Sequence, residues 1–262
     1  MQLNLTGRHA LVCGASQGIG RATAMELALL GASVTLLSRS ADALQAVAHE
    51  LPRDAGQQHH VVVADTLNTG HLASVAIDVV RRSPVHILIN NSGGPPGGPA
   101  STAEPDAYLA AFRQHLIAGQ TLVQACLPGM REARYGRIVN IISTSVKEPL
   151  ANLGVSNTVR AAVAGWAKTL SGELAADGIT VNNVLPGYTR TARLDNILAT
   201  TIQRTGKSQA EVEQGMLAGV PAARFGEAAE VAAVAAFLCT PAAAYVNGVS
   251  IPVDGGRTRS LS

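Results

Sequence analysis

The residues best suited to bind a phosphate group form a glycine-rich run near the N-terminus, Gly14-Ala15-Ser16-Gln17-Gly18-Ile19-Gly20. The run lies between an apolar segment, 9–15, and a segment with helical spacing, 20–32. Glycine lets the backbone turn tightly and approach a pyrophosphate, whose charge is met by free N–H groups and the positive end of the following helix. The alternative is an incidental glycine-rich turn, but the position between strand and helix favours a dinucleotide site.

Ser38 and Arg39 lie at the end of the second apolar segment, where a dinucleotide-binding domain that prefers NAD places an acidic residue for the ribose hydroxyls. No carboxylate is present at this point. Arg39 can pair with a 2′-phosphate, and Ser38 and Ser40 can add neutral hydrogen bonds, so these residues favour NADP(H). A solvated arginine at a strand end is the alternative interpretation.

Two further polar groups follow the third and fourth apolar segments. Asp65-Thr66 is placed to receive the adenine edge of the cofactor. The run Asn90-Asn91-Ser92-Gly93 is expected beside the adenosine ribose, with Asn91, Ser92 and Gly93 as the contacts. An Asn-Asn-Ser-Gly sequence is also a favourable turn without any ligand.

These groups need a sheet that brings them to one edge. Seven short apolar runs alternate with segments of helical spacing; they are 9–15, 33–38, 60–65, 85–91, 136–143, 179–186 and 249–256. Runs without polar alternation are typical of parallel strands buried on both faces. The helical segments 20–32 and 156–178 stop at the plausible caps Gly31 and Gly178. The pattern predicts one doubly wound α/β domain over residues 1–262, with 93–101 as a surface loop.

The amino-acid composition argues against a disordered chain and against nucleic acid or membrane partners. Hydrophobic residues make up 47% and charged residues 15% of the chain, against about 25% charged in ordinary soluble proteins, which argues against disorder. Aromatic residues make up only 3%, so the core must consist of small side chains. A net charge of +2 without a basic cluster argues against nucleic acid and membrane partners. The separated Cys13, Cys126 and Cys239 suit reduced thiols in a cytoplasmic protein and show no metal-ligand spacing.

Several motifs closely resemble the short-chain dehydrogenase/reductase family, in particular its acyl-carrier-protein ketoreductase branch. Besides the glycine run and 90–93, they are the segments 136–143 (GRIVNIIS), 186–187 (PG), 224–227 (RFGE) and 253–256 (VDGG). The resemblance runs nearly end to end. It implies a Rossmann-type seven-stranded parallel sheet with helices on both faces, hydride transfer to or from a nicotinamide cofactor, and a homo-oligomer, either a dimer or a tetramer.

The family's catalytic residues are a serine, a tyrosine thirteen residues later, a lysine four beyond that, and an asparagine one helix earlier. This chain matches the serine with Ser143. The other three positions hold Ser156, Arg160 and His115. None of the four tyrosines in the chain falls at the tyrosine position.

The replacements are expected to keep some of the family's roles. Ser156 and Arg160 are four residues apart and therefore share one face of a helix. Arg160 is a permanent cation with forked donors and can hold the nicotinamide ribose. A serine hydroxyl is much less acidic than a tyrosine, whose pKa is about 10, so Ser156 is expected to donate a hydrogen bond to a substrate oxygen rather than a proton.

Three other side chains are candidates for the proton donor. His115 has a suitable intrinsic pKa, although a packed neutral histidine is the simpler interpretation. Lys147 lies four residues after Ser143, yet a solvated loop lysine is more common. Tyr188 follows Pro186-Gly187, which borders the nicotinamide in the family, and is expected mainly as a wall of the substrate pocket.

The segment 188–222 is polar and helical without a strand pattern, and by the resemblance it forms a lid over the substrate. Thr189 and Thr191 are expected to contact the cofactor, together with Pro186 and Gly187. Arg190 and Arg193 are candidates for binding an anionic substrate, with a solvated helix face as the alternative.

Three functions remain open from the sequence. The first is an NADP(H)-dependent oxidoreductase that interconverts a carbonyl and a secondary alcohol of a small molecule, for example a 3-oxoacyl thioester. The second is a nucleotide-binding sensor or scaffold without redox turnover, suggested by the missing tyrosine and lysine. The third is a lyase or isomerase that reuses the pocket.

Overall fold

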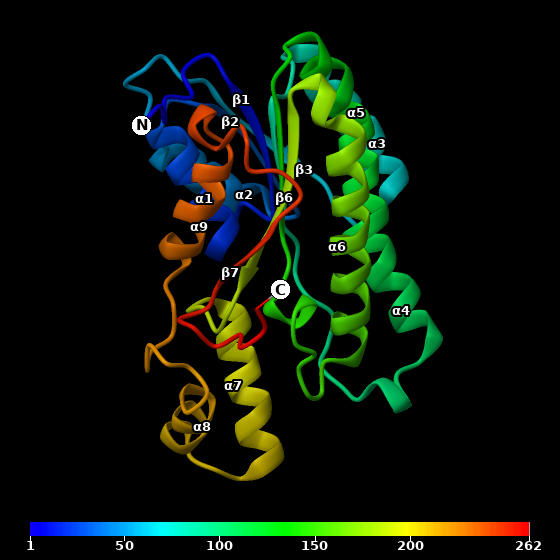
Figure 1. Cartoon of the computed structure of the whole chain (residues 1–262), viewed down its shortest axis with the longest axis vertical. Coiled ribbons are helices and arrows are strands. Elements are labelled where there is room, and N and C mark those ends of the chain that lie inside the picture. The colour runs from blue at the N-terminus through cyan, green and yellow to red at the C-terminus, as the bar shows by residue number, and fades with distance from the viewer. Residues whose placement is uncertain (262) are drawn as a thin grey trace.

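The computed structural model describes residues 1–261, and these residues build one seven-stranded sheet in the order β3-β2-β1-β4-β5-β6-β7 (Figure 1). All neighbouring strands are parallel. The strands are β1 (His9–Cys13), β2 (Ser33–Ser38), β3 (His59–Val63), β4 (Ile87–Asn90), β5 (Gly136–Ile141), β6 (Ile179–Pro186) and β7 (Ser250–Val253). Every predicted apolar run overlaps one of these strands, although β3 begins one residue earlier than predicted, so the predicted fold class is confirmed.

Helices cover both faces of the sheet. The described helices are α1 (Gly18–Leu29), α2 (Ala41–Glu50), α3 (Thr69–Arg82), α4 (Pro105–Phe112), α5 (Ala118–Glu132), α6 (Gly154–Leu174), α7 (Ala192–Thr205), α8 (Gln209–Leu217) and α9 (Ala228–Leu238). In one apolar core α1, α2 and α9 pack against the sheet, and in the other α3, α5 and α6 do so. Figure 1 shows these two groups on opposite sides of the strands.

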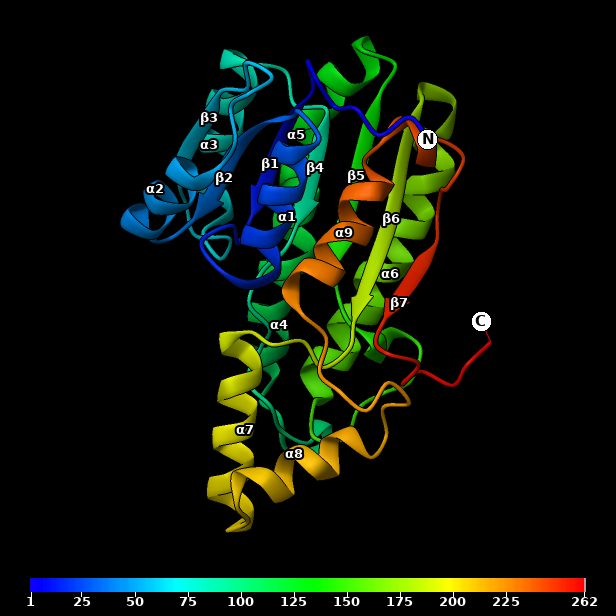
Figure 2. The same cartoon turned by 90° about the vertical axis from the view of Figure 1, so that its left-hand side faces the viewer.

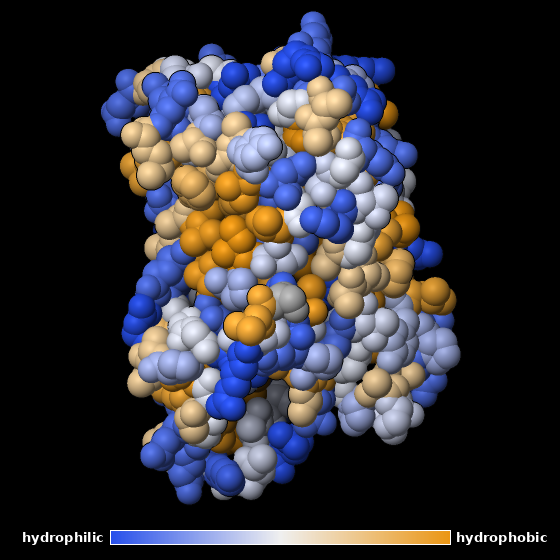
Figure 3. All heavy atoms as spheres, in the orientation of Figure 1, coloured by the Kyte–Doolittle hydropathy of each residue, from blue (hydrophilic) through white to orange (hydrophobic). Residues whose placement is uncertain are grey.

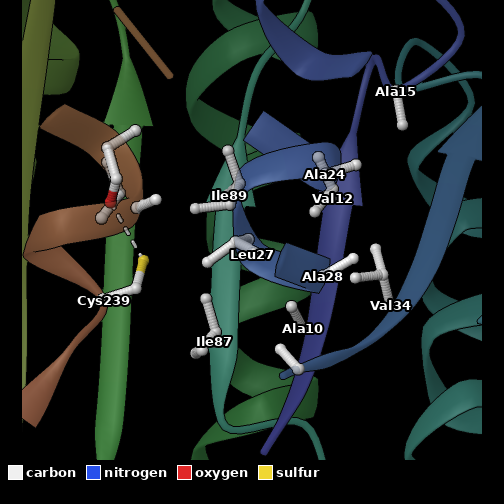
Figure 4. Packing of buried hydrophobic residues seen from close by; sticks show 14 of the residues in the cluster. Ala10, Val12, Ala15, Ala24, Leu27, Ala28, Val34, Ile87, Ile89 and Cys239 are labelled. Carbon is white, nitrogen blue, oxygen red and sulfur yellow. Dashed lines mark hydrogen bonds between the residues drawn. The ribbon is translucent and has the colours of Figure 1, made fainter. Parts of the chain in front are cut away.

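The core between α1, α9 and the sheet mixes alanine with the larger leucine and isoleucine, whereas the low aromatic content predicted small side chains. Ala10, Ala24 and Ala28 are fully buried and allow α1 to lie close to the strands (Figure 4). Cys239 is also fully buried there, and burial raises the pKa of its thiol to about 12. All three cysteines are free and buried, which suits structural rather than reactive thiols.

Strand order reverses direction between β1 and β4, the two strands at the centre of the sheet. In open α/β sheets ligands bind beyond the carboxyl ends of the strands at this reversal. The glycine run 14–20 follows β1, and residues 91–93 follow β4, so both lie at this point. The fold therefore brings two of the predicted binding segments together.

The ends of the long helices differ slightly from the sequence prediction. Helix α6 starts at Gly154, because Gly98 of the predicted surface loop exchanges backbone hydrogen bonds with Asn152 and Gly154. A Cβ on Gly154 would come within 2.4 Å of the Ala100 nitrogen, so the loop packs tightly on the start of α6. Gly178, with a φ of 76°, ends the short turn after α6 as a left-handed cap.

Helices α7 and α8 extend beyond the carboxyl ends of the strands (Figure 2). They share a small apolar core of their own, formed by Leu194, Leu198, Val212 and Phe225. The absence of strands predicted for 188–222 holds in the described structure, apart from a single bridge between Thr189 and Gly226. No helix within residues 1–261 combines the length and the apolar character needed to cross a membrane.

Candidate functional site

The turn between β1 and α1 requires glycine for steric reasons. Gly14 and Gly18 have φ values of 60° and 56°, in the region that favours glycine. A Cβ on Gly14 would stand 2.6 Å from Nδ2 of Asn91, and one on Gly20 would stand 2.2 Å from the Gly14 carbonyl oxygen. The backbone of the turn is thus packed as closely as a phosphate-binding loop requires.

The N-terminus of α1 is available to an anion. Gln17, its N-cap residue, makes no side-chain cap hydrogen bond, and the first turn contains no acidic residue. The free N–H groups and the positive end of the helix dipole therefore lack a side-chain partner. A Cβ on Gly18 would lie 3.2 Å from Cγ2 of Thr191, which places the start of the 188–222 segment against this turn.

The predicted ribose-binding residues after β4 have structural partners as well. The side-chain amide of Asn91 donates to the carbonyl oxygens of Cys13 and Gly14 at 3.3 and 3.4 Å. Asn91 therefore braces the glycine turn from β4. Ser92 forms a hydrogen bond with His115 at 2.7 Å, and a Cβ on Gly93 would meet no atom within 4 Å, so this glycine borders open space.

At the carboxyl end of β2 the side chain of Arg39 is exposed and forms no ion pair within residues 1–261. Ser38 accepts a hydrogen bond from the backbone N–H of Ser40 at 3.3 Å, which turns the chain toward α2. After β3, Asp65 accepts from the backbone N–H of Leu67 at 2.9 Å. Arg39 is thus the free cation at the position predicted to bind a 2′-phosphate.

Ser143 lies two residues after the end of β5 and caps the short turn Thr144–Val146, where its hydroxyl accepts from the N–H of Ser145 at 3.1 Å. Helix α6 packs against this turn. Ser156 is in the first turn of α6 and is buried, and its hydroxyl has no hydrogen-bond partner within residues 1–261. The fold therefore leaves the donor capacity of Ser156 free.

Arg160, one helical turn after Ser156, is almost entirely buried. One terminal nitrogen, Nη1, donates to the carbonyl oxygen of Ile141 at 2.9 Å, and Nε has no partner in the described structure. Burial, with the nearby charge of Arg193, lowers the pKa of Arg160 to about 10. The guanidinium therefore stays charged at neutral pH, with donor capacity left over.

His115 lies in a π-helical turn, Arg113–Ile117, between α4 and α5. Such turns occur frequently at functional sites. Its Nδ1 bonds with the Ser92 hydroxyl at 2.7 Å, while Nε2 is buried without a partner in the described residues. Burial, with the charge of Arg160, lowers the pKa of His115 to about 3, so the imidazole is neutral at pH 7.

A ladder of side-chain amides crosses the sheet beside His115. Asn90 donates to Asn140, Asn140 donates to Asn183, and Asn183 donates to Ser250, at 2.9, 2.9 and 3.0 Å. Each pair is in direct register on β4, β5, β6 and β7. Sequence reasoning missed this ladder, because register between strands is not visible in one sequence. The signal that could have found it is a polar side chain inside each of four otherwise apolar runs.

The ladder ends at a small cavity of about 20 Å³, room for about one water molecule. Its lining includes Asn90, Asn140, His115, Arg160 and Thr66. Oδ1 of Asn90 and Nε2 of His115 are both buried without a partner in the described structure. The predicted residues His115, Arg160 and Ser92 thus meet at one place, whereas Ser143 and Ser156 do not line this cavity.

The segment after β6 is held by backbone contacts. A Cβ on Gly187 would stand 2.7 Å from the Cα of Asp254, so this glycine permits the close approach of the residues after β7. Thr189 donates to the Gly187 carbonyl oxygen and Thr191 donates to that of Thr189, both at 3.2 Å. Hydrogen bonds within residues 187–191 therefore fix the orientation of both threonine hydroxyls. Thr191 also lies against Gly18 of the glycine turn.

Tyr188, predicted as a pocket wall, packs edge-on against Phe225 with ring centroids 6.3 Å apart. The guanidinium carbon of Arg257 lies 4.9 Å from the centroid of the Tyr188 ring. Lys147 forms no ion pair within residues 1–261. Tyr188 thus connects the lid to the C-terminal segment.

A family model described as enoyl-(acyl carrier protein) reductase matches residues 14–258. The NADPH-dependent reductase BacG of Bacillus subtilis is 31% identical over 262 residues, which cover 98% of this chain and 100% of the relative. The chain belongs to the short-chain dehydrogenase/reductase family. Another member, the 3-oxoacyl-[acyl-carrier-protein] reductase FabG of Pseudomonas aeruginosa, is 32% identical, with 97% of this chain and 98% of the relative covered.

Solved structures of the same short-chain dehydrogenase/reductase fold match over the whole chain. The L-sorbose reductase of Gluconobacter frateurii, complexed with NADPH and L-sorbose, superposes with a TM-score of 0.92 at 28% identity and 100% coverage of both chains. YwfH, an NADPH-dependent reductase involved in bacilysin biosynthesis, superposes with a TM-score of 0.91 at 30% identity, covering 97% of this chain and 99% of the other. These relatives agree with the prediction of NADP(H) as cofactor.

Proposed function

We propose that this short-chain dehydrogenase/reductase is an NADP(H)-dependent oxidoreductase that interconverts a carbonyl and a secondary alcohol of a small molecule. The observation that carries the proposal is the glycine turn at the uncapped start of α1, with Arg39 free at the end of the next strand. The relatives named as NADPH-dependent reductases support the same cofactor. A 3-oxoacyl thioester is one candidate substrate, by likeness to the relatives named for that reaction.

The residues fit a dinucleotide in three places. Gly14, Ser16, Gln17, Gly18, Ile19 and Gly20, with the N–H groups of α1, would hold the pyrophosphate. Ser38 and Arg39 would hold the 2′-phosphate, and Asp65 and Thr66 the adenine. Asn91, Ser92, Gly93, Pro186, Gly187, Thr189 and Thr191 would border the ribose groups and the nicotinamide, and Arg160 would bind the nicotinamide ribose.

A reduced nicotinamide, when bound, supplies the hydride that reaches the substrate carbon. Ser143 follows β5, and Ser156 lies in the first turn of α6. Helix α6 packs against the turn that Ser143 caps. We assign both hydroxyls to the substrate oxygen, where hydrogen bonds stabilise the negative charge that develops as hydride adds to the carbonyl carbon and the C=O double bond becomes single. The free hydroxyl of Ser156 and its buried position support this role.

The oxygen also needs a proton, and the neutral state of His115 limits how it can be supplied. With a pKa of about 3, the imidazole holds no second proton at pH 7. His115 would therefore act as a relay: Nε2 would release its proton toward the substrate oxygen while Nδ1 takes one from the Ser92 hydroxyl, which solvent would reprotonate. Lys147, which forms no ion pair within residues 1–261, and Tyr188 remain the alternative donors.

Two structural expectations belong to the same proposal. Residues 1–262 would act as a single NADP-binding domain, in which 188–222 covers the substrate as a lid; the projection of α7 and α8 beyond the sheet supports this arrangement (Figure 2). The protein would form a dimer or tetramer in the cytoplasm. Figure 3 shows apolar side chains gathered where α9 and β7 lie in Figure 1, which suits association through that face.

The test combines cofactor binding with turnover. NADPH and NADH binding is measured by the fluorescence of the reduced cofactor, followed by oxidation of NADPH with a panel of ketones and 3-oxoacyl thioesters. We expect tighter binding of NADPH and its oxidation by at least one ketone. Tight binding without oxidation across the panel would favour a sensor, scaffold or non-redox enzyme, and no binding of either dinucleotide would refute the cofactor site.

A further inference from the structure

Two arginine side chains meet at the loop that follows β4. Arg193, in the first turn of α7, donates from Nη2 to the carbonyl oxygen of Pro95 at 2.8 Å. The same nitrogen lies 3.3 Å from the point where a Cβ on Gly94 would stand, and Nη2 of Arg160 lies 3.7 Å from that point. Two guanidinium groups from different elements therefore share one glycine as their neighbour.

No carboxylate within residues 1–261 balances these two charges. The described ion pairs join Arg21 to Glu50, Arg81 to Asp78, Arg131 to Asp177, Arg190 to Glu227 and Arg224 to Glu230. Burial lowers the pKa of Arg193, and the charge of Arg193 contributes to the lowered pKa of Arg160. Such mutual repulsion is relieved when an anion binds between or beside the two groups.

A third cation without an ion-pair partner in the described structure contacts the residue after Ser143. Arg257, after β7, lies within 3.4 Å of the Thr144 hydroxyl through Nη1, and Thr144 directly follows Ser143. Its guanidinium carbon also lies 4.9 Å from the centroid of Tyr188. Arg257 belongs to none of the described ion pairs. Cations from the lid and from the C-terminal segment therefore approach the elements that hold the catalytic serine.

The cofactor phosphates have other partners. The pyrophosphate is assigned to the glycine turn, against which Thr191 lies, and the 2′-phosphate to Arg39, which follows the carboxyl end of β2. Arg193 is instead bound to Pro95, in the loop that packs on the start of α6, the helix that carries Ser156 and Arg160. An anion that met Arg193 there would belong to the molecule being reduced.

We propose that the substrate is an oxo acid and that Arg193 binds its carboxylate, with Arg257 as the second cation. This inference rests on the proposed function and names its substrate class. A guanidinium pairs well with a carboxylate because its forked N–H groups match the two oxygens. Arg193 is also partly exposed, so a ligand reaches it without unfolding the lid.

The chain offers a matched control three residues away. Arg190 lies in the same segment and already pairs with Glu227 at 3.3 Å, with its guanidinium carbon 5.4 Å from the centroid of Phe225. Removing the charge of Arg190 changes the net charge of the lid by the same amount as removing that of Arg193. Only Arg193 is assigned to the substrate.

The experiment compares oxo acids with their methyl esters, for example acetoacetate and levulinate with methyl acetoacetate and methyl levulinate. For the acids, we expect Arg193→Gln to lower kcat/KM about 10- to 100-fold, the range expected for a lost hydrogen bond to a charged group. For the esters, and for NADPH affinity, we expect changes within about twofold. Arg193→Lys should recover part of the loss, and Arg190→Gln should treat acids and esters alike.

Equal losses for acids and esters, or a loss of NADPH affinity in Arg193→Gln, would overturn the proposal, because a purely structural or cofactor-binding role predicts those results. A second measurement separates this proposal from the proposed function. Calorimetry of levulinate binding to the NADP+ complex needs no turnover, and we expect Arg193→Gln to weaken it about tenfold. Binding that is unchanged or undetectable in both proteins would refute the carboxylate site, whereas absent turnover alone would refute the reductase.

Discussion

The cofactor-binding region and the catalytic region of this protein differ in how closely they keep the pattern of the short-chain dehydrogenase/reductase family. Around β1, α1 and β2 the glycine turn and the free arginine follow it. At α6 and the π-helical turn, the resemblance assigns Ser156, Arg160 and His115 to positions of tyrosine, lysine and asparagine. The contrast has a physical reason, since a close backbone approach has one solution, glycine, whereas a hydrogen bond or a charge can come from several side chains.

Gly20→Ala should have the largest effect, because no other residue type can replace glycine in the turn between β1 and α1. The added Cβ would stand 2.2 Å from the Gly14 carbonyl oxygen and would force the glycine turn apart. We expect a loss of NADPH affinity of about 1,000-fold, equivalent to about 4 kcal/mol, measured by cofactor fluorescence.

Gly165→Ala is the matched control, since a Cβ there meets no atom within 4 Å and the residue lies within α6. It should bind NADPH normally and raise the free energy of unfolding by about 0.5–1 kcal/mol. Normal NADPH binding by Gly20→Ala, with the fold intact by circular dichroism, would contradict the role of the turn.

The double substitution Ser156→Tyr with Arg160→Lys tests the catalytic region, where the residue types differ from those of the family. It restores the residue types that the resemblance expects at one face of α6, where a lysine beside the ring favours proton donation by the tyrosine. We expect reduction of a ketone to rise about 100-fold, measured as NADPH oxidation. An activity no higher than that of the parent, with NADPH still bound, would mean that the two positions do not account for the difference.

Arg39→Asp should shift the choice of cofactor. The carboxylate repels a 2′-phosphate and can accept hydrogen bonds from the ribose hydroxyls of NADH. Because Arg39 is exposed, we expect a moderate effect, a fall of about tenfold in NADPH affinity with NADH affinity unchanged or higher. Titration of both cofactors into both proteins measures it, and a parallel fall for the two cofactors would remove Arg39 from the 2′-phosphate site.

His115→Asn should have the smallest effect, on the pH dependence of stability. The folded-state pKa of His115 is lowered to about 3, so the unfolded chain binds a proton below about pH 6.5 that the folded protein does not. Stability contributed by neutral His115 is present above that pH and is lost as the pH falls. Unfolding in urea at several pH values should show the parent losing about 1 kcal/mol more per pH unit than the variant between about pH 6.5 and 5.

A slope that is the same in both proteins would contradict the neutral, buried state of His115. The comparison of slopes matters more than absolute stability here, since burial also lowers the pKa of His86 to about 4. His86 therefore makes its own contribution to the loss of stability at acid pH. That contribution is common to both proteins and cancels.

The sheet could be predicted from the sequence because each buried parallel strand is a short apolar run flanked by helical spacing. The glycine turn could be predicted for the same local reason, since its residues and their neighbouring elements lie within twenty positions of one another. In both cases the information is local along the chain.

The rest of the site depends on contacts between distant segments. The bond from Arg193 to Pro95 joins residues 98 positions apart, and the contact of Arg257 with Thr144 joins residues 113 apart. The amide ladder through Asn140 depends on strand register. The sequence indicated that Arg193 could meet an anion, but packing alone shows that Arg190 is paired and Arg193 is not.

The proposed function depends most on hydride transfer. The site keeps the cofactor-binding residues of the short-chain dehydrogenase/reductase family but differs from the family in its catalytic residues. The direct test uses NADPH deuterated at the nicotinamide carbon that donates the hydride, mixed with the wild-type protein and the panel of oxo acids and ketones, with the products analysed by mass spectrometry. We expect an alcohol that carries one deuterium on the former carbonyl carbon. NADPH bound tightly with no deuterium in any product would contradict it.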